Sequence, residues 1–181
     1  DSILSTKFFN KKQVEDLLGT NLVKYNFLIT FHPEKDDIKN QIKFIKLSFN
    51  YLSKIKNIKI FITAPNSDAN NKTLIEILKK EVNKNKKIFY YNSSLGNRLY
   101  YSLIKFIDGV IGNSSSGICE VPSFNKGTIN IGTRQDGRPR SKSIIDIKYD
   151  IDEFKSVLQK IMSTKFKQSL NKNINPYGNN K

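Results

Sequence analysis

Apolar residues recur along this chain with two periods, one typical of helices and one typical of buried strands. Between residues 36 and 53, Ile38, Ile42, Ile45, Phe49 and Leu52 are spaced by 4, 3, 4 and 3 residues. This spacing places them all on one face of a helix. Similar patterns predict further helices over residues 11–19, 73–82, 95–106 and 151–162.

Short runs of β-branched and aromatic residues lie between these helices and predict buried strands. They span residues 25–31, 58–63, 87–91, 108–112, 126–132 and 143–147. Strands that alternate with helices are typical of βαβ units and a mainly parallel sheet covered on both faces. We therefore predict a three-layer α/β domain over residues 11–167. Residues 1–10 are interpreted as a linker or incoming segment, and the Asn- and Lys-rich residues 168–181 as a flexible tail.

Small and hydroxyl-bearing residues follow the predicted strand 108–112. The stretch Gly112-Asn113-Ser114-Ser115-Ser116-Gly117 leads into a predicted short helix that ends near Pro122. Free backbone N–H groups and the positive end of a helix dipole make such a turn suitable for an anion. A serine-rich helix cap explains the turn equally well, because it matches neither a dinucleotide fingerprint nor a Walker A loop. Glu120 lies roughly one turn into the helix, where its carboxylate can reach the hydroxyl groups of a ribose.

Other polar residues also follow predicted strands, and the carboxyl ends of parallel strands form the ligand-binding edge of such sheets. His32 follows the first strand, where a lone histidine is either a packed residue or a donor to a phosphate. The arginines concentrate in the loop before the last strand: Arg134, Arg138 and Arg140. In a chain that otherwise uses lysine, they suggest a need for the guanidinium fork, although they also fit a solvated loop. We expect these residues to gather around a nucleotide-type pocket.

The amino-acid composition and net charge limit the classes of function that the chain can have. The chain has 181 residues and a net charge of +15, from 31 basic and 16 acidic side chains, which raises the hypothesis of a nucleic-acid partner. The lysines are spread along the whole chain, which favours solvated helix faces instead, and no RNP1 or helix-turn-helix signature is present. The single cysteine, Cys119, excludes an internal disulfide and suits a reducing cytoplasm. One histidine and one cysteine cannot build a zinc site, and no apolar run approaches the ~20 residues of a membrane span.

Several stretches together resemble one known family. They are Ile111–Ile118 with Glu120, Pro122-Ser123, Thr128–Gly132, Arg134-Gln135, Gly137-Arg138 and Arg140. Weaker matches are Thr30–Pro33, Pro65–Asp68, Leu95-Gly96 with Tyr100, and Asn175–Gly178. The combination is similar to the hydrolysing UDP-N-acetylglucosamine 2-epimerase family, and it covers roughly residues 7–178.

The resemblance implies one half of a GT-B architecture, in which two Rossmann-like domains enclose a cleft. This chain resembles the C-terminal half. The proton-transferring carboxylates of the family belong to its N-terminal domain, so the chain alone is expected to be inactive, and a terminal helix is expected after the tail. The implied reaction eliminates UDP across C1–C2 of the sugar. Water then adds, and the 2-epimerised sugar is released for sialic-acid-type synthesis.

In this resemblance, the domain holds the UDP leaving group. The residues expected to contact UDP are Asn113, Ser114, Ser115, Ser116, Gly117, Glu120, Arg134, Arg138 and Tyr91, with His32 as the candidate catalytic residue. The serines are expected to bind the diphosphate, and Glu120 the ribose hydroxyl groups. His32 and the arginines, Arg138 above all, would neutralise the phosphate charge that grows as UDP departs. The base is expected near Tyr90, Tyr91 and Leu95.

The implied partners are a UDP-sugar, the N-terminal domain and, in the whole protein, further copies in a homo-oligomer. No cofactor, metal, nucleic acid or membrane is expected, and the expected location is the cytoplasm. Two alternatives stay open. The donor-nucleotide domain of a GT-B glycosyltransferase would also use a Gly/Ser turn and a ribose-binding carboxylate, although the triple serine with the downstream arginines favours the epimerase. A basic nucleic-acid-binding domain is the second alternative.

Overall fold

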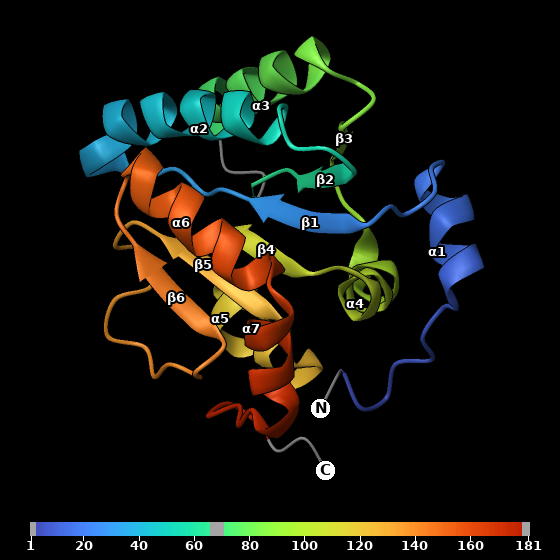
Figure 1. The fold of residues 1–181 in the computed structure, drawn as a ribbon. Coiled ribbons are helices and arrows are strands. Elements are labelled where there is room, and N and C mark those ends of the chain that lie inside the picture. The colour runs from blue at the N-terminus through green and yellow to red at the C-terminus, as the bar shows by residue number, and fades with distance from the viewer. Residues whose placement is uncertain (1–2, 66–70, 179–181) are drawn as a thin grey trace.

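A six-stranded sheet in which every strand is parallel to its neighbours forms the centre of the computed structural model, which describes residues 3–65 and 71–178 (Figure 1). The strands are β1 (Tyr25–Thr30), β2 (Ile58–Thr63), β3 (Phe89–Asn92), β4 (Gly109–Gly112), β5 (Gly127–Ile131) and β6 (Ile144–Ile147). Their order across the sheet is β3-β2-β1-β4-β5-β6. This is the doubly wound order of Rossmann-like domains. The predicted α/β class with a mainly parallel sheet is therefore confirmed.

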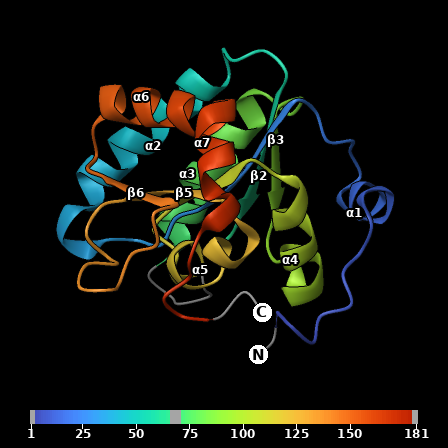
Figure 2. The ribbon, with the colours of Figure 1, turned by 60° about the horizontal axis from the view of Figure 1, so that its bottom comes forward.

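Helices cover both faces of the sheet and make the outer layers. They are α1 (Lys11–Leu18), α2 (Ile38–Leu52), α3 (Lys72–Lys84), α4 (Gly96–Phe106), α5 (Ser115–Cys119), α6 (Ile151–Met162) and α7 (Thr164–Ser169), with 3-10 turns η1 (Lys35–Asp37), η3 (Val121–Phe124) and η4 (Leu170–Lys172). Figure 2 shows α2, α3 and α6 on one side of the sheet and α4 and α5 on the other. The helix α1 packs against α4.

Two hydrophobic clusters hold these layers together, and β1 contributes to both. Phe27 and Ile29 point into the larger cluster, which is shared with α2, α3 and α6. Leu28, between them, points into the smaller cluster under α1 and α4. Successive strand side chains alternate between faces, so a strand buried on both faces is a continuous apolar run. This explains why residues 25–31 could be recognised as a buried strand.

The residues before α1 lie against α4. The backbone N–H of Phe9 donates a hydrogen bond to Oγ of Ser102 at 2.9 Å. The guanidinium of Arg98 lies 3.8 Å from the ring centroid of Phe9, and its Nε donates to the carbonyl of Lys7 at 2.6 Å. The incoming segment is thus fixed to the helix whose other side faces the candidate site.

A flexible tail is expected for residues 168–181, and residues 168–178, the part that the structure describes, pack on the domain. The helix α7 begins after Ser163, whose side chain accepts a hydrogen bond from the backbone N–H of Phe166. Phe166 and Leu170 are buried in the larger cluster. A serine directly before the first helical residue is an N-cap signal, which overall composition does not reveal.

Two buried asparagines continue this ordered stretch. Nδ2 of Asn173 donates to the carbonyl of Pro122 at 2.9 Å, and Nδ2 of Asn175 donates to the carbonyl of Cys119 at 2.8 Å. Both asparagines therefore satisfy backbone carbonyls at the end of α5 and in η3. Asparagine-rich composition is typical of flexible segments, whereas these two amide groups are buried hydrogen-bond donors within the fold.

Gly112 ends β4 in a backbone conformation that a side chain would block. Its φ is +131°, and a Cβ built there would lie 2.0 Å from the carbonyl oxygen of Thr30. The neighbour is backbone of β1, which cannot move without breaking the sheet. Glycine is therefore required for the chain to leave β4 beside β1.

We expect Gly112→Ala to lower the free energy of unfolding by about 3 kcal/mol or more, because strain and collision add at this position. Urea denaturation followed by circular dichroism measures the loss. Gly19→Ala is the matched control, since Gly19 also has a positive φ of +68° but has no atom within 4 Å of the added Cβ. The control should lose about 1 kcal/mol. Equal losses in the two variants would contradict the collision argument.

Candidate functional site

The strand order reverses between β1 and β4, and the side-chain amide of Asn113 joins the carboxyl ends of these two strands. Its Oδ1 accepts a hydrogen bond from the backbone N–H of His32 at 2.7 Å, and its Nδ2 donates to the carbonyl of His32 at 2.8 Å. Asn113 is fully buried. Doubly wound sheets bind ligands at this reversal point. The amide therefore fixes His32 at the expected ligand edge.

Glu34 connects this edge to the loop that follows β5. Its carboxylate accepts hydrogen bonds from Nδ2 of Asn113 at 3.2 Å, from N–H and Oγ1 of Thr133 at 3.3 Å, and from N–H of Arg134 at 3.2 Å. Burial, followed by the negative charge of Glu34, raises the pKa of Tyr149, whose hydroxyl faces this carboxylate. Glu34 was missed in the sequence because an acidic residue after a strand has no distinctive pattern.

Gln41 holds the same edge from the side of α2. Its Nε2 donates to the carbonyl of His32 at 2.8 Å, and its Oε1 accepts from the backbone N–H of Glu34 at 3.1 Å. Gln41 is fully buried. In the sequence, the one feature that could indicate a buried role for Gln41 is its position next to the apolar stripe of the helix.

The serine turn begins α5 and divides its small residues between different tasks. Ser114 is the N-cap, and its Oγ accepts a hydrogen bond from the backbone N–H of Ser116 at 3.4 Å. Gly117 is buried, and a Cβ there would lie 2.9 Å from Cγ2 of Thr128. The hydroxyl of Thr128 donates to the carbonyl of Gly117 at 2.8 Å. Gly117 therefore lets α5 pack closely on β5.

Glu120 lies one turn after the serines, with both carboxylate oxygens oriented by hydroxyl groups. The hydroxyl of Tyr101 donates to Oε1 at 3.0 Å, and Oγ of Ser116 donates to Oε2 at 2.6 Å. The hydroxyl of Tyr100 is 2.5 Å from Oγ of Ser116. The two tyrosines come from α4, so α4 and α5 together hold this carboxylate.

An open cavity of about 660 Å³ lies between these elements. Its lining comes from the ends of β1, β2 and β3, from α3 and α4, and from the serine turn. The lining residues are Thr30, His32, Thr63, Ala64, Pro65, Ile75, Lys79, Tyr91, Ser93, Ser94, Leu95, Gly96, Asn97, Tyr100, Tyr101, Ser114, Ser116 and Glu120. Nζ of Lys79 lies 5.5 Å from the ring centroid of Tyr91, and burial raises the pKa of that tyrosine.

Some of the site residues that are expected from the sequence line this cavity. His32, Tyr91, Ser114, Ser116 and Glu120 line it, although they are distant in sequence. The remaining expected residues are not among its lining residues: Asn113, Ser115, Gly117, Arg134 and Arg138. Asn113 and Gly117 are buried and have structural roles, and Ser115 is exposed. The stretch 66–68, which entered the resemblance, lies outside the described residues.

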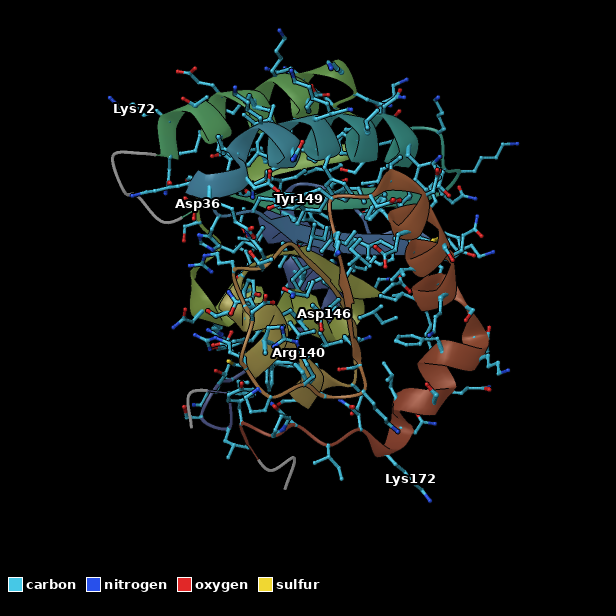
Figure 3. All side chains as sticks on the ribbon, turned by 90° about the vertical axis from the view of Figure 1, so that its left-hand side faces the viewer. Asp36, Lys72, Arg140, Asp146, Tyr149 and Lys172 are labelled. Atoms are coloured by element: carbon cyan, nitrogen blue, oxygen red, sulfur yellow. The ribbon has the colours of Figure 1, made fainter. Side chains whose placement is uncertain are left out.

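Arg134, Arg138 and Arg140 are not among the residues that line the cavity, and each has a partner within the fold. Arg140 donates from Nε to both carboxylate oxygens of Asp146, at 3.0 and 3.2 Å, and Figure 3 shows the pair side by side. Nη1 of Arg134 donates to the carbonyl of Asn113 at 3.1 Å. Nη1 of Arg138 donates to Sγ of Cys119 at 3.3 Å. The concentration of arginines therefore serves at least in part to fix the loop between β5 and β6.

Within residues 3–65 and 71–178, no group of three His, Cys, Asp or Glu side chains is placed to hold a metal ion. Over the same residues, no helix combines the length and the apolar character needed to cross a membrane.

Comparisons with known proteins agree on one family. The family model for UDP-N-acetylglucosamine 2-epimerase matches residues 1–181. The chain is 40% identical over 167 residues to GDP/UDP-N,N'-diacetylbacillosamine 2-epimerase (hydrolyzing) of Campylobacter jejuni, covering 92% of this chain and 43% of that protein. It is 33% identical over 177 residues to polysialic acid biosynthesis protein P7 of Escherichia coli, covering 98% and 45%. The chain thus spans about half the length of the curated relatives it matches.

A solved structure shows the same fold. The S. aureus MnaA-UDP co-structure superposes with a TM-score of 0.71 at 16% identity, and the match covers 94% of this chain and 46% of that chain.

We expect Asn113→Ala to lower the free energy of unfolding by about 2–4 kcal/mol, because it leaves the N–H of His32 without its partner and opens a cavity. Chemical denaturation measures the change. Asn40→Ala is the control, since Asn40 is exposed on α2 and bonds only to Asp37 in the described structure. A loss at Asn113 no larger than the loss at Asn40 would contradict a structural role for the buried amide.

Proposed function

The chain belongs to the UDP-N-acetylglucosamine 2-epimerase family, and from this we propose that it is the nucleotide-binding C-terminal half of a hydrolysing UDP-sugar 2-epimerase. In this proposal, the whole enzyme eliminates UDP from UDP-N-acetylglucosamine or a related UDP-sugar. Water then adds to the intermediate, and the 2-epimerised sugar is released. The Campylobacter relative, named as a hydrolyzing 2-epimerase, supports this reaction class.

The observation that carries the proposal is the cavity at the strand reversal, with both His32 and Glu120 in its lining. Both oxygens of Glu120 are oriented by donors, and the residue lines the cavity. A carboxylate fixed in this way suits two neighbouring hydroxyl donors, such as those of a ribose. We therefore assign the ribose of UDP to Glu120.

The diphosphate is assigned to the start of α5 and to His32. Oγ of Ser114 accepts a hydrogen bond from Ser116, so its own proton can be donated to a phosphate oxygen. His32 lines the same cavity, and its backbone is fixed by Asn113. Donors fixed before the reaction stabilise the negative charge that grows on the leaving UDP.

The arginines take a secondary place in this proposal. Arg134 and Arg138 are exposed and already contact Asn113 and Cys119. The base is assigned to the part of the cavity beside Tyr91 and Leu95, at the end of β3 and the start of α4.

The other half of the enzyme completes the proposal. It supplies the carboxylates that move protons at the sugar, and with this chain it forms the GT-B cleft. The domain limits of 11–167, assembly of the whole enzyme into a homo-oligomer and a cytoplasmic location belong to the same proposal. For this chain, the proposal assigns contacts to the UDP part of the substrate only, because most contacts to the sugar are assigned to the other half of the enzyme.

UDP should bind the 181-residue chain, and Glu120→Ala should weaken binding by about 10- to 100-fold, because charge-assisted hydrogen bonds to the ribose are lost. Isothermal titration calorimetry measures both constants. Asp16→Ala removes an exposed carboxylate on α1 and should leave the affinity unchanged. A folded chain that gives no binding signal with UDP would overturn the proposed function.

The chain alone should not turn over UDP-N-acetylglucosamine, because the carboxylates that transfer protons are assigned to the other half. A coupled assay for released UDP checks this with the chain at high concentration. Sustained release of UDP and free sugar would place the proton-transfer groups within these 181 residues instead.

A further inference from the structure

Two tyrosines on α4 connect to Glu120 through three hydrogen bonds that the proposed mechanism does not use directly. The hydroxyl of Tyr101 donates to Oε1 of Glu120 at 3.0 Å. The hydroxyl of Tyr100 and Oγ of Ser116 are 2.5 Å apart, and Ser116 is bonded to Oε2 of Glu120 at 2.6 Å. The four side chains therefore form one connected network at the wall of the cavity.

The number of available protons sets the direction of every bond in this network. An ionised carboxylate only accepts hydrogen bonds, so Ser116 must donate its single hydroxyl proton to Glu120. Ser116 can then only accept from Tyr100, which must be the donor. Burial raises the pKa of Tyr100, so this tyrosine keeps its proton and remains a donor at neutral pH.

The direction of these hydrogen bonds prevents the hydroxyl of Ser116 from donating to a phosphate. Its hydroxyl proton is committed to Glu120, and the oxygen can offer only a lone pair to a ligand. Phosphate oxygens are acceptors and need a donor. The side chain of Ser116 is thus unsuited to bind the diphosphate, in contrast to the hydroxyl of Ser114.

The tyrosine rings are held by packing as well as by hydrogen bonds. Tyr101 is 4% exposed, and its ring is stacked on Phe124 with centroids 6.1 Å apart and an interplanar angle of 24°. Tyr100 packs against Tyr101 edge to face, with centroids 5.7 Å apart. Donors on fixed rings can orient a carboxylate before a ligand arrives, which reduces the ordering needed on binding.

We propose that Tyr100 and Tyr101 are positioning residues that fix Glu120 as a two-oxygen acceptor, and so make the site prefer a nucleoside diphosphate with an intact ribose diol over its 2′-deoxy counterpart. Each carboxylate oxygen accepts one hydroxyl from the protein and keeps a second lone pair for the ligand. A diol uses both remaining acceptor positions, whereas a 2′-deoxyribose leaves one of them unpaired. This inference rests on the proposed binding of UDP in the cavity.

The test compares the affinities for UDP and 2′-deoxyUDP by calorimetry on the 181-residue chain. Wild type should bind UDP about tenfold or more tightly than 2′-deoxyUDP. Tyr101→Phe keeps the ring and removes the donor, so this preference should fall to about threefold or less while the affinity for 2′-deoxyUDP changes little. Tyr100→Phe and Ser116→Ala should reduce the preference in the same direction through Oε2.

Tyr51→Phe is the matched control. Tyr51 lies on α2, packs edge to face on Phe154 on the other side of the sheet, and should keep the wild-type preference. Thermal unfolding of each variant shows whether the fold is kept. A merely structural effect would weaken the binding of both nucleotides by the same factor, whereas loss of the donor should weaken the binding of UDP alone. If Tyr101→Phe and Tyr100→Phe keep the wild-type preference, the positioning roles are overturned while the UDP site stands.

Other outcomes are equally decisive. If Ser116→Ala weakens both ligands equally in a stable protein, its hydroxyl contacts the diphosphate and the inferred direction of the network is wrong. If wild type binds neither nucleotide, the proposed function fails, and the positioning roles fail with it.

Discussion

The hydrogen bonds between the buried amide of Asn113 and the backbone of His32 are the interaction on which the ligand edge depends. The pairing of β1 with β4 ends at Thr30 and Gly112, where the positive φ of Gly112 turns the chain away. Beyond that point, a side chain rather than a strand satisfies the polar groups of His32. Buried backbone groups without partners are costly, so this replacement allows β1 and α5 to diverge and leave room for a ligand.

The two sides of this junction have different chemistry. On the side of β2 and β3, the surface opens into a cavity lined by hydroxyl, aromatic and imidazole groups. On the side of β5 and β6, charged groups pair with each other or with backbone, as Glu34 does with Thr133 and Arg140 with Asp146. An arginine committed to a carboxylate fixes a loop and is not available to a ligand. This pairing applies to Arg140, whereas Arg134 and Arg138 contact Asn113 and Cys119, and none of the three lines the cavity.

Hydrophobic periodicity was sufficient to predict the fold, because the alternation of buried strands and amphipathic helices is local information. The stripe from Ile38 to Leu52 and the apolar run of β1 needed no knowledge of the rest of the chain. The connections within the site are not local. Asn113 lies 81 residues from His32, and Tyr101, on α4, lies 19 residues from Glu120, which follows the last residue of α5. Which polar group meets which depends on how α4 and α5 pack, and no pattern in the sequence encodes that packing.

The same reasoning changes how the triple serine should be understood. Three identical side chains in a row invite one shared role, yet the structure gives each a different environment. Ser114 caps α5, Ser115 is exposed, and Ser116 donates to Glu120. The flanking glycines meet steric requirements of β1 and β5, as the close contacts at Gly112 and Gly117 show. The motif is therefore a set of separate packing and hydrogen-bonding requirements, and in the proposed function the recognition of a nucleotide is assigned to Glu120 and to the tyrosines that orient it.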